Sequence, residues 1–413
     1  MFVDGKILTA PVKDRVSPGP LGVRMCDKSK CFDGYTLFSP AYGYTEYLID
    51  LNGMVVHTWP VTKSQLAELR PDGHLLVDRD ALVGRDARKQ GGETGLDELL
   101  SDGKRVWHWN GPYHHDFEVL PNDNIICLTA RNEPPREGFY PSDLEPPQMR
   151  TDVVVEIDRS GSVIWEFPFS DHIAEVCDLT GLPQPVRHEV LAVDGTLELG
   201  IASDWAHTNT IEVLPDTPLG RRDARFRTGN LLFSFRSLDI IGIIDRNREK
   251  IVWAWGLGIL DGQHQPTMLP DGHILIFDNG TYRGYSAVVE MDPESGEVVW
   301  RYEDGDNFYS PYRSGVQRLP NGNTLICECD AGRIFEVTAG KEIVWDYYSP
   351  FLGQGPENQG RHIFRATRYT EAEVEPLFVS RTEEFIAVAD SERKPLTSFR
   401  EVLEFYQAGF KKK

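Results

Sequence analysis

Short runs of alternating apolar and polar residues recur along the chain, and each run ends in a pair of rings. Four of these runs share an acidic turn followed by Val and Ile residues: EIDRSGSVIWEF, IIDRNREKIVWAW, EMDPESGEVVWRY and EVTAGKEIVWDY. The ring pairs His57–Trp59 and Trp107–Trp109 end two further runs. Alternation with a period of two is typical of a half-buried β-strand. The pattern therefore predicts a series of β-hairpins and a repetitive, all-β fold.

A second repeated phrase is a polar turn between two apolar stretches. It reads LRPDGHLL from Leu69, LPNDNIICL from Leu120, LPDGHILIF from Leu269 and LPNGNTLIC from Leu319, with a longer version from Leu214. Pro, Asn, Asp and Gly in these positions favour a tight turn between two strands. The two phrases together give four strands per repeat, at a spacing of about 45 to 50 residues, which is the period of a β-propeller blade.

The two ends of the repeat region complement each other. The first stretch, GYTLFSPAYGYTEYLIDLNGMVVHTW, contains only the outer strands of a blade, and GRHIFRATRY near residue 365 reads as a lone inner strand. Joining the two gives a sixth blade and removes the open sheet edges. We therefore predict a leader over residues 1–34, a six-bladed propeller over 35–370 and a helical segment over 371–413. Thr370 and Glu373 match a helix capping box at the start of that segment.

Composition narrows the possible partners. The net charge of −21 argues against nucleic acid, because binding to phosphates requires a basic face. No apolar run approaches the length of a membrane span, and Met1–Ala10 lacks the apolar core of a secretory signal. We expect a cytoplasmic protein, or a secreted or periplasmic one if a signal was removed. The six cysteines form no recognisable disulfide framework, and Cys26 with Cys31 is the one pair whose spacing allows a bond.

Histidines begin the predicted inner strands. His115 and His264 each lie five residues before the leucine of a turn phrase, His207 lies seven before one, and His362 opens the lone inner strand. Inner strands of a propeller start near its central channel, so equivalent positions from different blades converge. Imidazoles serve as nucleophiles, proton carriers and metal ligands. The register thus predicts a ring of four imidazoles at the channel.

Other polar residues are placed on the same face. Asn209 follows His207 by two positions and so points the same way along the strand. Arg236 lies in the FSFRSLD strand of the same blade, and Arg283 follows the strand that begins near His264. A guanidinium binds sulfate, phosphate or carboxylate through two parallel hydrogen bonds. The alternative is that these arginines pair with surface carboxylates, but the apolar surroundings of Arg236 favour an anion site there.

These motifs occur in a familiar order. DWAHTN, SFRSLD, DGQHQPTMLPDGHILIFDNGTYRG and YSPYRSG, with the opening GYTLFSP, resemble the arylsulfotransferase family, whose members are six-bladed propellers. The resemblance implies that His264, preceded by Gln263 and followed by the Asp-Asn-Gly turn, accepts a sulfuryl group from an aryl sulfate and passes it to a phenol. It further implies that four residues surround the transferred group: His115, His207, Asn209 and Arg236. The predicted substrate-binding residues are Asn209, Gln263 and Arg283.

The resemblance has departures. The periplasmic enzymes of the family carry a signal peptide, an N-terminal β-domain and a cysteine pair before the nucleophile. In their place this chain has a short Pro-rich leader, a tight LGILDGQH connection and the added His362. The leading hypothesis is a sulfuryl transferase that acts on a small anionic substrate without a soluble cofactor, with His207 as the candidate base.

A competing hypothesis is a metal-dependent lyase or hydrolase. His115, His207, His264 and His362 would ligate one divalent transition metal, with Gln265 or neighbouring carboxylates completing the coordination. A third, non-enzymatic reading is a propeller that binds a partner on one face. The ring of histidines counts against that reading.

Overall fold

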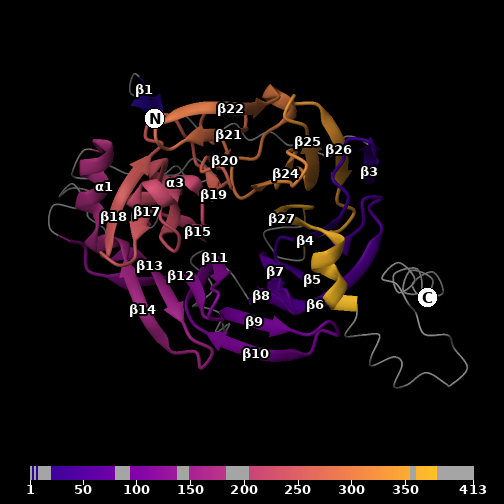
Figure 1. Cartoon of the computed structure of the whole chain (residues 1–413), viewed down its shortest axis with the longest axis horizontal. Coiled ribbons are helices and arrows are strands. Elements are labelled where there is room, and N and C mark those ends of the chain that lie inside the picture. Colours follow the sequence, from indigo (N-terminus) through magenta and orange to yellow (C-terminus); the bar gives the residue numbers. More distant parts are fainter. Residues whose placement is uncertain are drawn as a thin grey trace, which may run out of the picture. The chain divides into compact units, whose positions relative to one another are not determined.

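The computed structural model describes residues 2–3, 6–7, 20–79, 94–136, 148–182, 204–353 and 360–378. Six antiparallel sheets of four or five strands form the blades of a β-propeller (Figure 1). The predicted all-β, six-bladed fold is therefore confirmed. The chain divides into two compact units, of which the first contains Gly111–Val316 and the second contains Ser17–Asn110 and Gln317–Lys413. No helix in the described ranges is long and apolar enough to cross a membrane.

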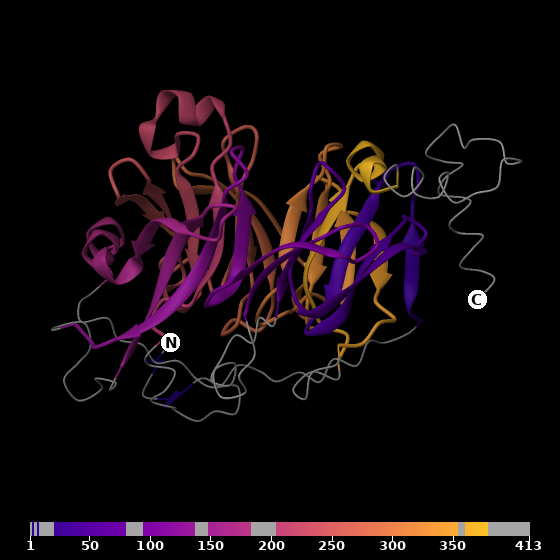
Figure 2. The ribbon, with the colours of Figure 1, turned by 90° about the horizontal axis from the view of Figure 1, so that it is seen from below.

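The first unit contains three four-stranded sheets. Their strands are coloured from purple to orange in Figure 2. One is made of β11 (Tyr113–Val119), β12 (Ile125–Glu133), β13 (Met149–Ile157) and β14 (Val163–Pro168). The next is made of β15 (Thr208–Val213), β16 (Leu231–Phe235), β17 (Ile240–Asp245) and β18 (Lys250–Trp255). The third is made of β19 (His264–Met268), β20 (Ile274–Asp278), β21 (Ala287–Asp292) and β22 (Glu297–Glu303). The short helices α1 (Ile173–Thr180) and α3 (Pro218–Arg222) lie in connections.

The remaining three sheets include the strands of the second unit. One is ordered β27 (Ile363–Tyr369), β4 (Tyr35–Pro40), β5 (Gly43–Ile49) and β6 (Val55–Ser64). Another contains β7 (Ala67–Leu69), β8 (Leu75–Arg79), β9 (Gly95–Leu99) and β10 (Arg105–Asn110). The last contains β23 (Gly315–Arg318), β24 (Thr324–Glu328), β25 (Arg333–Val337), β26 (Ile343–Tyr348) and β3 (Gly22–Cys26). A separate pair is formed by β1 (Phe2–Val3) and β2 (Lys6–Ile7).

Strands from both ends of the chain share a sheet, as predicted. β27 pairs with β4 in antiparallel register, with Tyr369 opposite Tyr35. The strand β3 was not predicted: it lies within the expected leader and pairs with β26 as a fifth strand. It covers a sheet edge that would otherwise offer unpaired main-chain groups. The predicted domain bounds are not tested by these pairings and stay a prediction.

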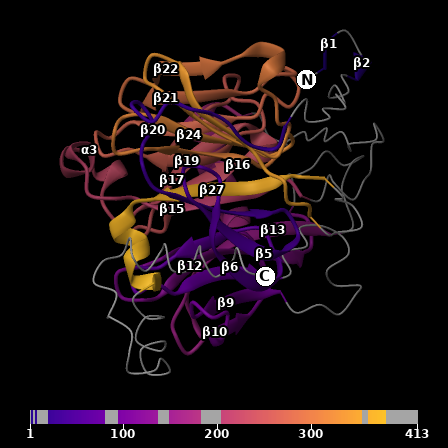
Figure 3. The same ribbon diagram turned by 90° about the vertical axis from the view of Figure 1, so that its right-hand side faces the viewer.

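A short helix follows β27 over residues 371–378 (Figure 3). The predicted capping box is formed: the main-chain N–H of Thr370 donates to Glu373 Oε2 at 2.7 Å, and that of Glu373 donates to Thr370 Oγ1 at 3.3 Å. Residues 379–413 of the predicted helical segment lie outside the described residues. The six cysteines are free thiols, Cys26 and Cys31 included.

The repeated turn phrase has a common hydrogen-bond pattern. In four blades an Asp or Asn accepts a bond from the main-chain N–H two residues later, and that later residue bonds a glutamate on the third strand of the sheet. The pairs are His74–Glu98 at 2.7 Å, His273–Glu290 at 2.8 Å, Asn124–Glu156 at 2.6 Å and Asn323–Glu336 at 2.6 Å. Histidine and asparagine are interchangeable in this role, so the bond explains why the phrase recurs.

The sheets of the first unit pack through large apolar side chains. One cluster between its first two sheets includes Phe169, Trp205, Phe233 and Phe235, each fully buried. The ring centroids of Trp205 and Phe235 are 5.5 Å apart. Burying such side chains is worth about 1.5–3 kcal/mol each. This packing fixes the segment 204–206 against β16, and the next residue is His207.

Two buried carboxyl groups in the second unit share one hydroxyl. Ser64 Oγ lies 2.5 Å from Glu46 Oε1 and 2.9 Å from Asp78 Oδ1. A hydroxyl has one proton to donate, so it can donate to one carboxyl while the other donates to it. Burial raises the pKa of Glu46 to about 8 and the pKa of Asp78 to about 6. At neutral pH Glu46 is therefore the protonated partner.

We expect the free energy of unfolding to fall as the pH rises through the pKa values of Asp78 and Glu46. The folded-state pKa of Glu46 lies above its ordinary value of 4.5, so its stabilising effect is complete below 4.5 and is lost as pH approaches 8. Glu46→Gln keeps a neutral donor for Ser64 and should raise the unfolding free energy at pH 9 by about 3–5 kcal/mol. Urea unfolding of both proteins at pH 4 and pH 9 measures this. Equal pH dependence in the two proteins would show that Glu46 does not titrate in this range.

Candidate active site

The inner strands that begin near the predicted histidines share an irregular backbone. The register shifts between Tyr113 and Phe117 on β11, between Thr208 and Thr210 on β15, and between His264 and Thr267 on β19. One residue at or just before each shift has a positive φ: +61° at His115, +47° at His207, which directly precedes β15, and +45° at Gln265. Residues other than glycine adopt this backbone conformation at a cost of about 1–3 kcal/mol. Bulges re-aim side chains and are frequent next to active sites.

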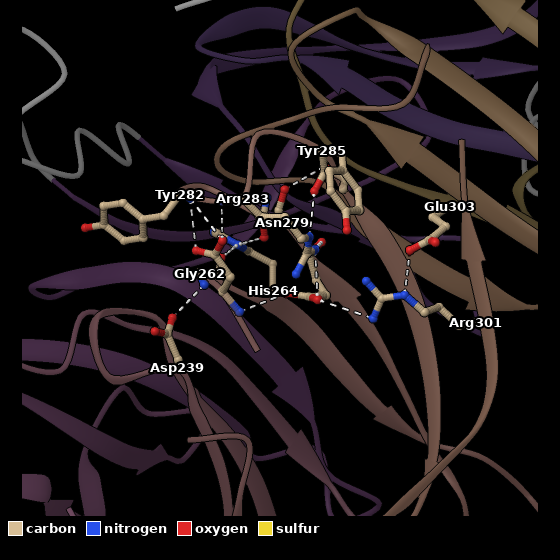
Figure 4. Close-up of polar contacts among 12 residues, drawn as sticks. Asp239, Gly262, His264, Asn279, Tyr282, Arg283, Tyr285, Arg301 and Glu303 are labelled. Atoms are coloured by element: carbon tan, nitrogen blue, oxygen red, sulfur yellow. Dashed lines mark hydrogen bonds and ion pairs between the residues drawn. The ribbon is translucent and has the colours of Figure 1, made fainter. Parts of the chain in front are cut away.

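His264 is held by hydrogen bonds to both ring nitrogens. Its Nδ1 lies 2.7 Å from Asn279 Oδ1 and 3.1 Å from the carbonyl oxygen of Gly262, and its Nε2 accepts a bond from the main-chain N–H of Arg313 at 3.1 Å (Figure 4). The Asn279 amide nitrogen donates to the carbonyl oxygens of Ser310 at 2.8 Å and Arg313 at 3.0 Å. These bonds orient the amide so that its oxygen accepts from Nδ1–H. The Nε2 atom therefore carries the lone pair.

The electrostatics keep His264 neutral. Burial lowers its pKa well below 6.5, and the positive charge of Arg236 lowers it further. A neutral imidazole with its lone pair on Nε2 is the form that can attack an electrophile. The residue is 4% exposed.

Arg236 has unused hydrogen-bonding capacity beside this histidine. It begins a short 3-10 turn (Arg236–Leu238) after β16, and its main-chain N–H donates to the carbonyl oxygen of His207 at 3.3 Å. Its Nε is buried without a hydrogen-bond partner, and no ion pair of its side chain is found within the described residues. A buried cationic donor without a partner is costly. This arrangement favours an anion as the missing partner.

His115 lies against two other imidazoles. Its Nδ1 is 2.8 Å from Nδ1 of His114, and its ring meets that of His207 edge to face with centroids 4.9 Å apart. His114 Nε2 lies 3.0 Å from the carbonyl oxygen of Thr129, so it carries the proton there and its Nδ1 accepts from His115. Burial, followed by the charges of His207 and His114, holds the pKa of His115 well below 6.5. The sequence had indicated no role for His114.

His207 is anchored by a carboxylate. Its Nδ1 lies 2.7 Å from Asp204 Oδ2, and Arg150 donates to the same oxygen at 3.4 Å. Arg150 also donates through Nε to Asp152 Oδ1 at 3.2 Å, and Asp152 Oδ2 accepts the main-chain N–H of Thr208 at 2.6 Å. Burial alone would raise the pKa of Asp204, but Arg150 and His207 together hold it below its usual range. Asp204 is therefore ionised.

The network around His207 was not predicted from the sequence. Asp204 belongs to the DWAHTN motif, yet nothing in its spacing separates it from a surface carboxylate. Arg150 and Asp152 lie on β13, in a different sheet from His207. The one available signal was the presence of charged residues in a strand whose neighbours are otherwise apolar.

Two predicted substrate-binding amides are turned into the protein. Asn209 Nδ2 donates to the carbonyl oxygen of Gln263 at 2.8 Å, and Gln263 Nε2 lies 3.0 Å from Ser234 Oγ, 3.1 Å from the carbonyl oxygen of Phe235 and 3.0 Å from that of Ile240. Both side chains are fully buried. These bonds fix the start of β19 against β15 and β16, which positions His264. A contact of either amide with substrate stays a prediction.

Arg283 forms an ion pair with a carboxylate, which is the alternative that the sequence left open. Its guanidinium lies 2.9 Å from Asp278 Oδ2, and Nε donates to the carbonyl oxygen of Tyr285 at 3.2 Å (Figure 4). Asp278 is fully buried. The substrate-binding role of Arg283 also stays a prediction, since its guanidinium already neutralises a buried carboxylate.

The fourth predicted histidine belongs to the second unit. His362 Nε2 lies 3.5 Å from Asp330 Oδ1. Its place beside the other three imidazoles stays a prediction.

Candidate metal ligands come together in the repeated turns. In the described ranges, two sets of three residues bring one ligand atom each within 4.8 Å of the others: Asp72, His74 and Glu98, and Asp271, His273 and Glu290. Both belong to the repeated turns, where Asn124 and Asn323 make the same bond to glutamate. His115, His207 and His264 form no such set in those ranges. A metal held by these three histidines together with His362 stays a hypothesis.

Comparison with known proteins identifies the family. The family model described as arylsulfotransferase (ASST) matches residues 101–349, which is more than half of the 413 residues. The chain belongs to the arylsulfotransferase family. Membership implies a transferase, and the matched range includes His115, His207, Arg236 and His264 but not His362. No curated protein matches the chain.

Several solved structures resemble this arylsulfotransferase-family chain. A protein of unknown function from Bacteroides caccae has 13% identity and a TM-score of 0.49, over 82% of this chain and 100% of its own. A streptogramin B lyase has 12% identity and a TM-score of 0.43, over 86% and 96%. AztD from Citrobacter koseri has 10% identity and a TM-score of 0.40, over 82% and 99%.

Proposed function

We propose that this chain transfers a sulfuryl group from an aryl sulfate to a phenolic acceptor through a sulfohistidine at His264. The observation that carries the proposal is the neutral imidazole of His264 next to the buried, unpaired Nε of Arg236. A nucleophile and an unfilled cationic donor are the two groups that transfer of an anionic sulfuryl group requires.

The transfer proceeds in two displacements. In the first, His264 Nε2 attacks sulfur and the bond between sulfur and the aryl oxygen breaks. In the second, the acceptor oxygen attacks the same sulfur and the bond to Nε2 breaks. The main-chain N–H of Arg313, which donates to Nε2 in the resting site at 3.1 Å, loses its acceptor as the nitrogen–sulfur bond forms. It is then available to a sulfuryl oxygen. No soluble cofactor takes part in this scheme.

Charge on the sulfuryl oxygens is met by groups already in place. Arg236 supplies the cation, and the two neighbouring imidazoles are each held in place by a partner on Nδ1: His114 for His115 and Asp204 for His207. Because these groups are held by buried hydrogen bonds, they need little rearrangement during the reaction. Preorganised donors of this kind are usually the largest single contribution to catalysis.

Steady-state kinetics test the proposal. Initial rates should be measured while 4-nitrophenyl sulfate and phenol are varied together. A sulfohistidine mechanism predicts parallel lines in double-reciprocal plots, because the donor product leaves before the acceptor reacts. Intersecting lines, or hydrolysis of the sulfate that does not respond to phenol, would contradict the proposed transfer.

A further inference from the structure

The three imidazoles of the first unit differ in the group that holds Nδ1. Nδ1 of His264 meets the neutral amide oxygen of Asn279 at 2.7 Å, and Nδ1 of His115 meets the neutral ring of His114 at 2.8 Å. Nδ1 of His207 meets the carboxylate of Asp204 at 2.7 Å. A carboxylate stabilises an imidazolium far more than a neutral acceptor does. Of these three residues, His207 is therefore the one suited to hold a proton on both nitrogens.

The second nitrogen of His207 is accessible. The side chain is 24% exposed, whereas His115 and His264 are 7% and 4% exposed as residues. No hydrogen bond to its Nε2 is found within the parts of the chain that the structure describes. Its ring centroid lies 4.9 Å from that of His115, and its carbonyl oxygen accepts a bond at 3.3 Å from the main-chain N–H of Arg236, whose charge acts on His264. Its Nε2 can thus meet an oxygen of a substrate bound at His264.

Asp204 is built into the protein as a fixed anion. Arg150 joins it to Asp152, and Asp152 accepts the main-chain N–H of Thr208, the residue after His207. The next residue, Trp205, is fully buried in the apolar cluster described above. Asp204 Oδ1 is also buried and makes no hydrogen bond. The Asp204 carboxylate thus keeps one oxygen that can accept a further hydrogen bond, and its neighbours hold it in place. Both features are expected of a group that stabilises a transient positive charge on His207.

We infer that Asp204 is a positioning residue that holds His207 as the general acid and base of the transfer, so that the site accepts aryl sulfates of weakly acidic phenols. This inference rests on the proposed function. In the first displacement, the Nε2–H of His207 passes its proton to the departing aryl oxygen as the sulfur–oxygen bond breaks. In the second, the acceptor phenol gives its proton to Nε2 as its oxygen attacks sulfur. The proton count balances over one cycle, and His207 ends as it began.

The test is how rate depends on the leaving group. kcat/KM should be measured for a series of substituted phenyl sulfates in the wild type and in Asp204→Asn. Phenol has a pKa of about 10, so its departure needs a proton, whereas the more acidic 4-nitrophenol leaves as the anion. General acid catalysis contributes about 10²–10⁴-fold. We expect Asp204→Asn to lose about 100-fold with phenyl sulfate and much less with 4-nitrophenyl sulfate.

Two further variants make the result specific. Asp245→Asn is the matched control, since Asp245 is also a buried carboxylate that pairs with an arginine in the β15–β18 region but makes no bond to His207. It should keep the leaving-group dependence of the wild type. His207→Gln should show the same steepening as Asp204→Asn, and it answers the question if Asp204→Asn does not fold.

The outcomes separate the two claims. A steeper dependence in Asp204→Asn or His207→Gln supports the inference. If the wild type forms a sulfohistidine and transfers normally but both variants keep its dependence, the inference is wrong and the proposed function stands. If the wild type forms no sulfohistidine, the proposed function fails, and the inference fails with it.

Discussion

Replacing His264 with alanine is expected to abolish sulfuryl transfer. The variant lacks the nitrogen that bonds sulfur, so turnover should fall by roughly 10⁴-fold or more, as for other enzymes that lose their nucleophile. It also leaves the Asn279 amide oxygen and the Arg313 N–H without their ring partners, at about 1–3 kcal/mol for each buried group. A lower melting temperature with a folded far-UV circular dichroism spectrum should accompany the loss. Product formation from 4-nitrophenyl sulfate and phenol measures the activity.

The chain supplies a matched control for this variant. His273 lies in the turn of the same blade and bonds Glu290, and asparagines make the equivalent bond in two other blades: Asn124 to Glu156 and Asn323 to Glu336. His273→Asn should therefore retain both fold and activity. Activity in His264→Ala equal to that of His273→Asn would remove His264 from the mechanism.

Arg236→Lys is expected to lower turnover by roughly a hundredfold, or about 3 kcal/mol. Charge builds on the transferring oxygens during the displacement, and a guanidinium can meet two of them with parallel hydrogen bonds, which an ammonium cannot. The buried Nε of Arg236 without a partner is the donor that this charge would satisfy. The effect should therefore appear mainly in kcat, with a smaller change in KM.

Steady-state rates of Arg236→Lys against the wild type measure this split. Arg227→Lys is the control, because Arg227 is a partly exposed arginine of the same region that pairs with Asp245. Its kinetics should match the wild type. An increase in KM alone for Arg236→Lys would mean that Arg236 only captures the anion and does not stabilise the transition state.

The fold could be predicted because the signals are local. A turn such as LPDGHILIF fixes its own hydrogen bonds within a few residues, as in the bond from the main-chain N–H of His273 to Asp271 and that from Gly272 to Leu269. The strand alternation likewise depends only on neighbouring positions. The strand β3 was missed because its reason for forming is the edge of β26, more than 300 residues away in sequence.

The site was predictable in its strand positions but not in its supporting contacts. The spacing from the turn phrase placed His115 and His264 near the starts of strands; in the structure His264 is the first residue of β19 and His115 the third of β11. The bulges with positive φ at His115 and His207 leave no mark in the sequence, since neither residue is a glycine. The roles of Asn279 and Asp204 follow from contacts that only the folded chain makes. Asn209 and Gln263 are the residue types that a substrate-binding role requires. In the structure, however, their amide nitrogens donate hydrogen bonds to main-chain carbonyl oxygens.

The most direct test is mass spectrometry of the protein after reaction with an aryl sulfate in the absence of acceptor. The account predicts one added sulfuryl group on the peptide that contains His264, lost when phenol is supplied and absent in His264→Ala. Because a sulfohistidine is labile in acid, the digestion should be kept at alkaline pH. Turnover of donor and acceptor without this label, or with the label on another residue, would contradict the account.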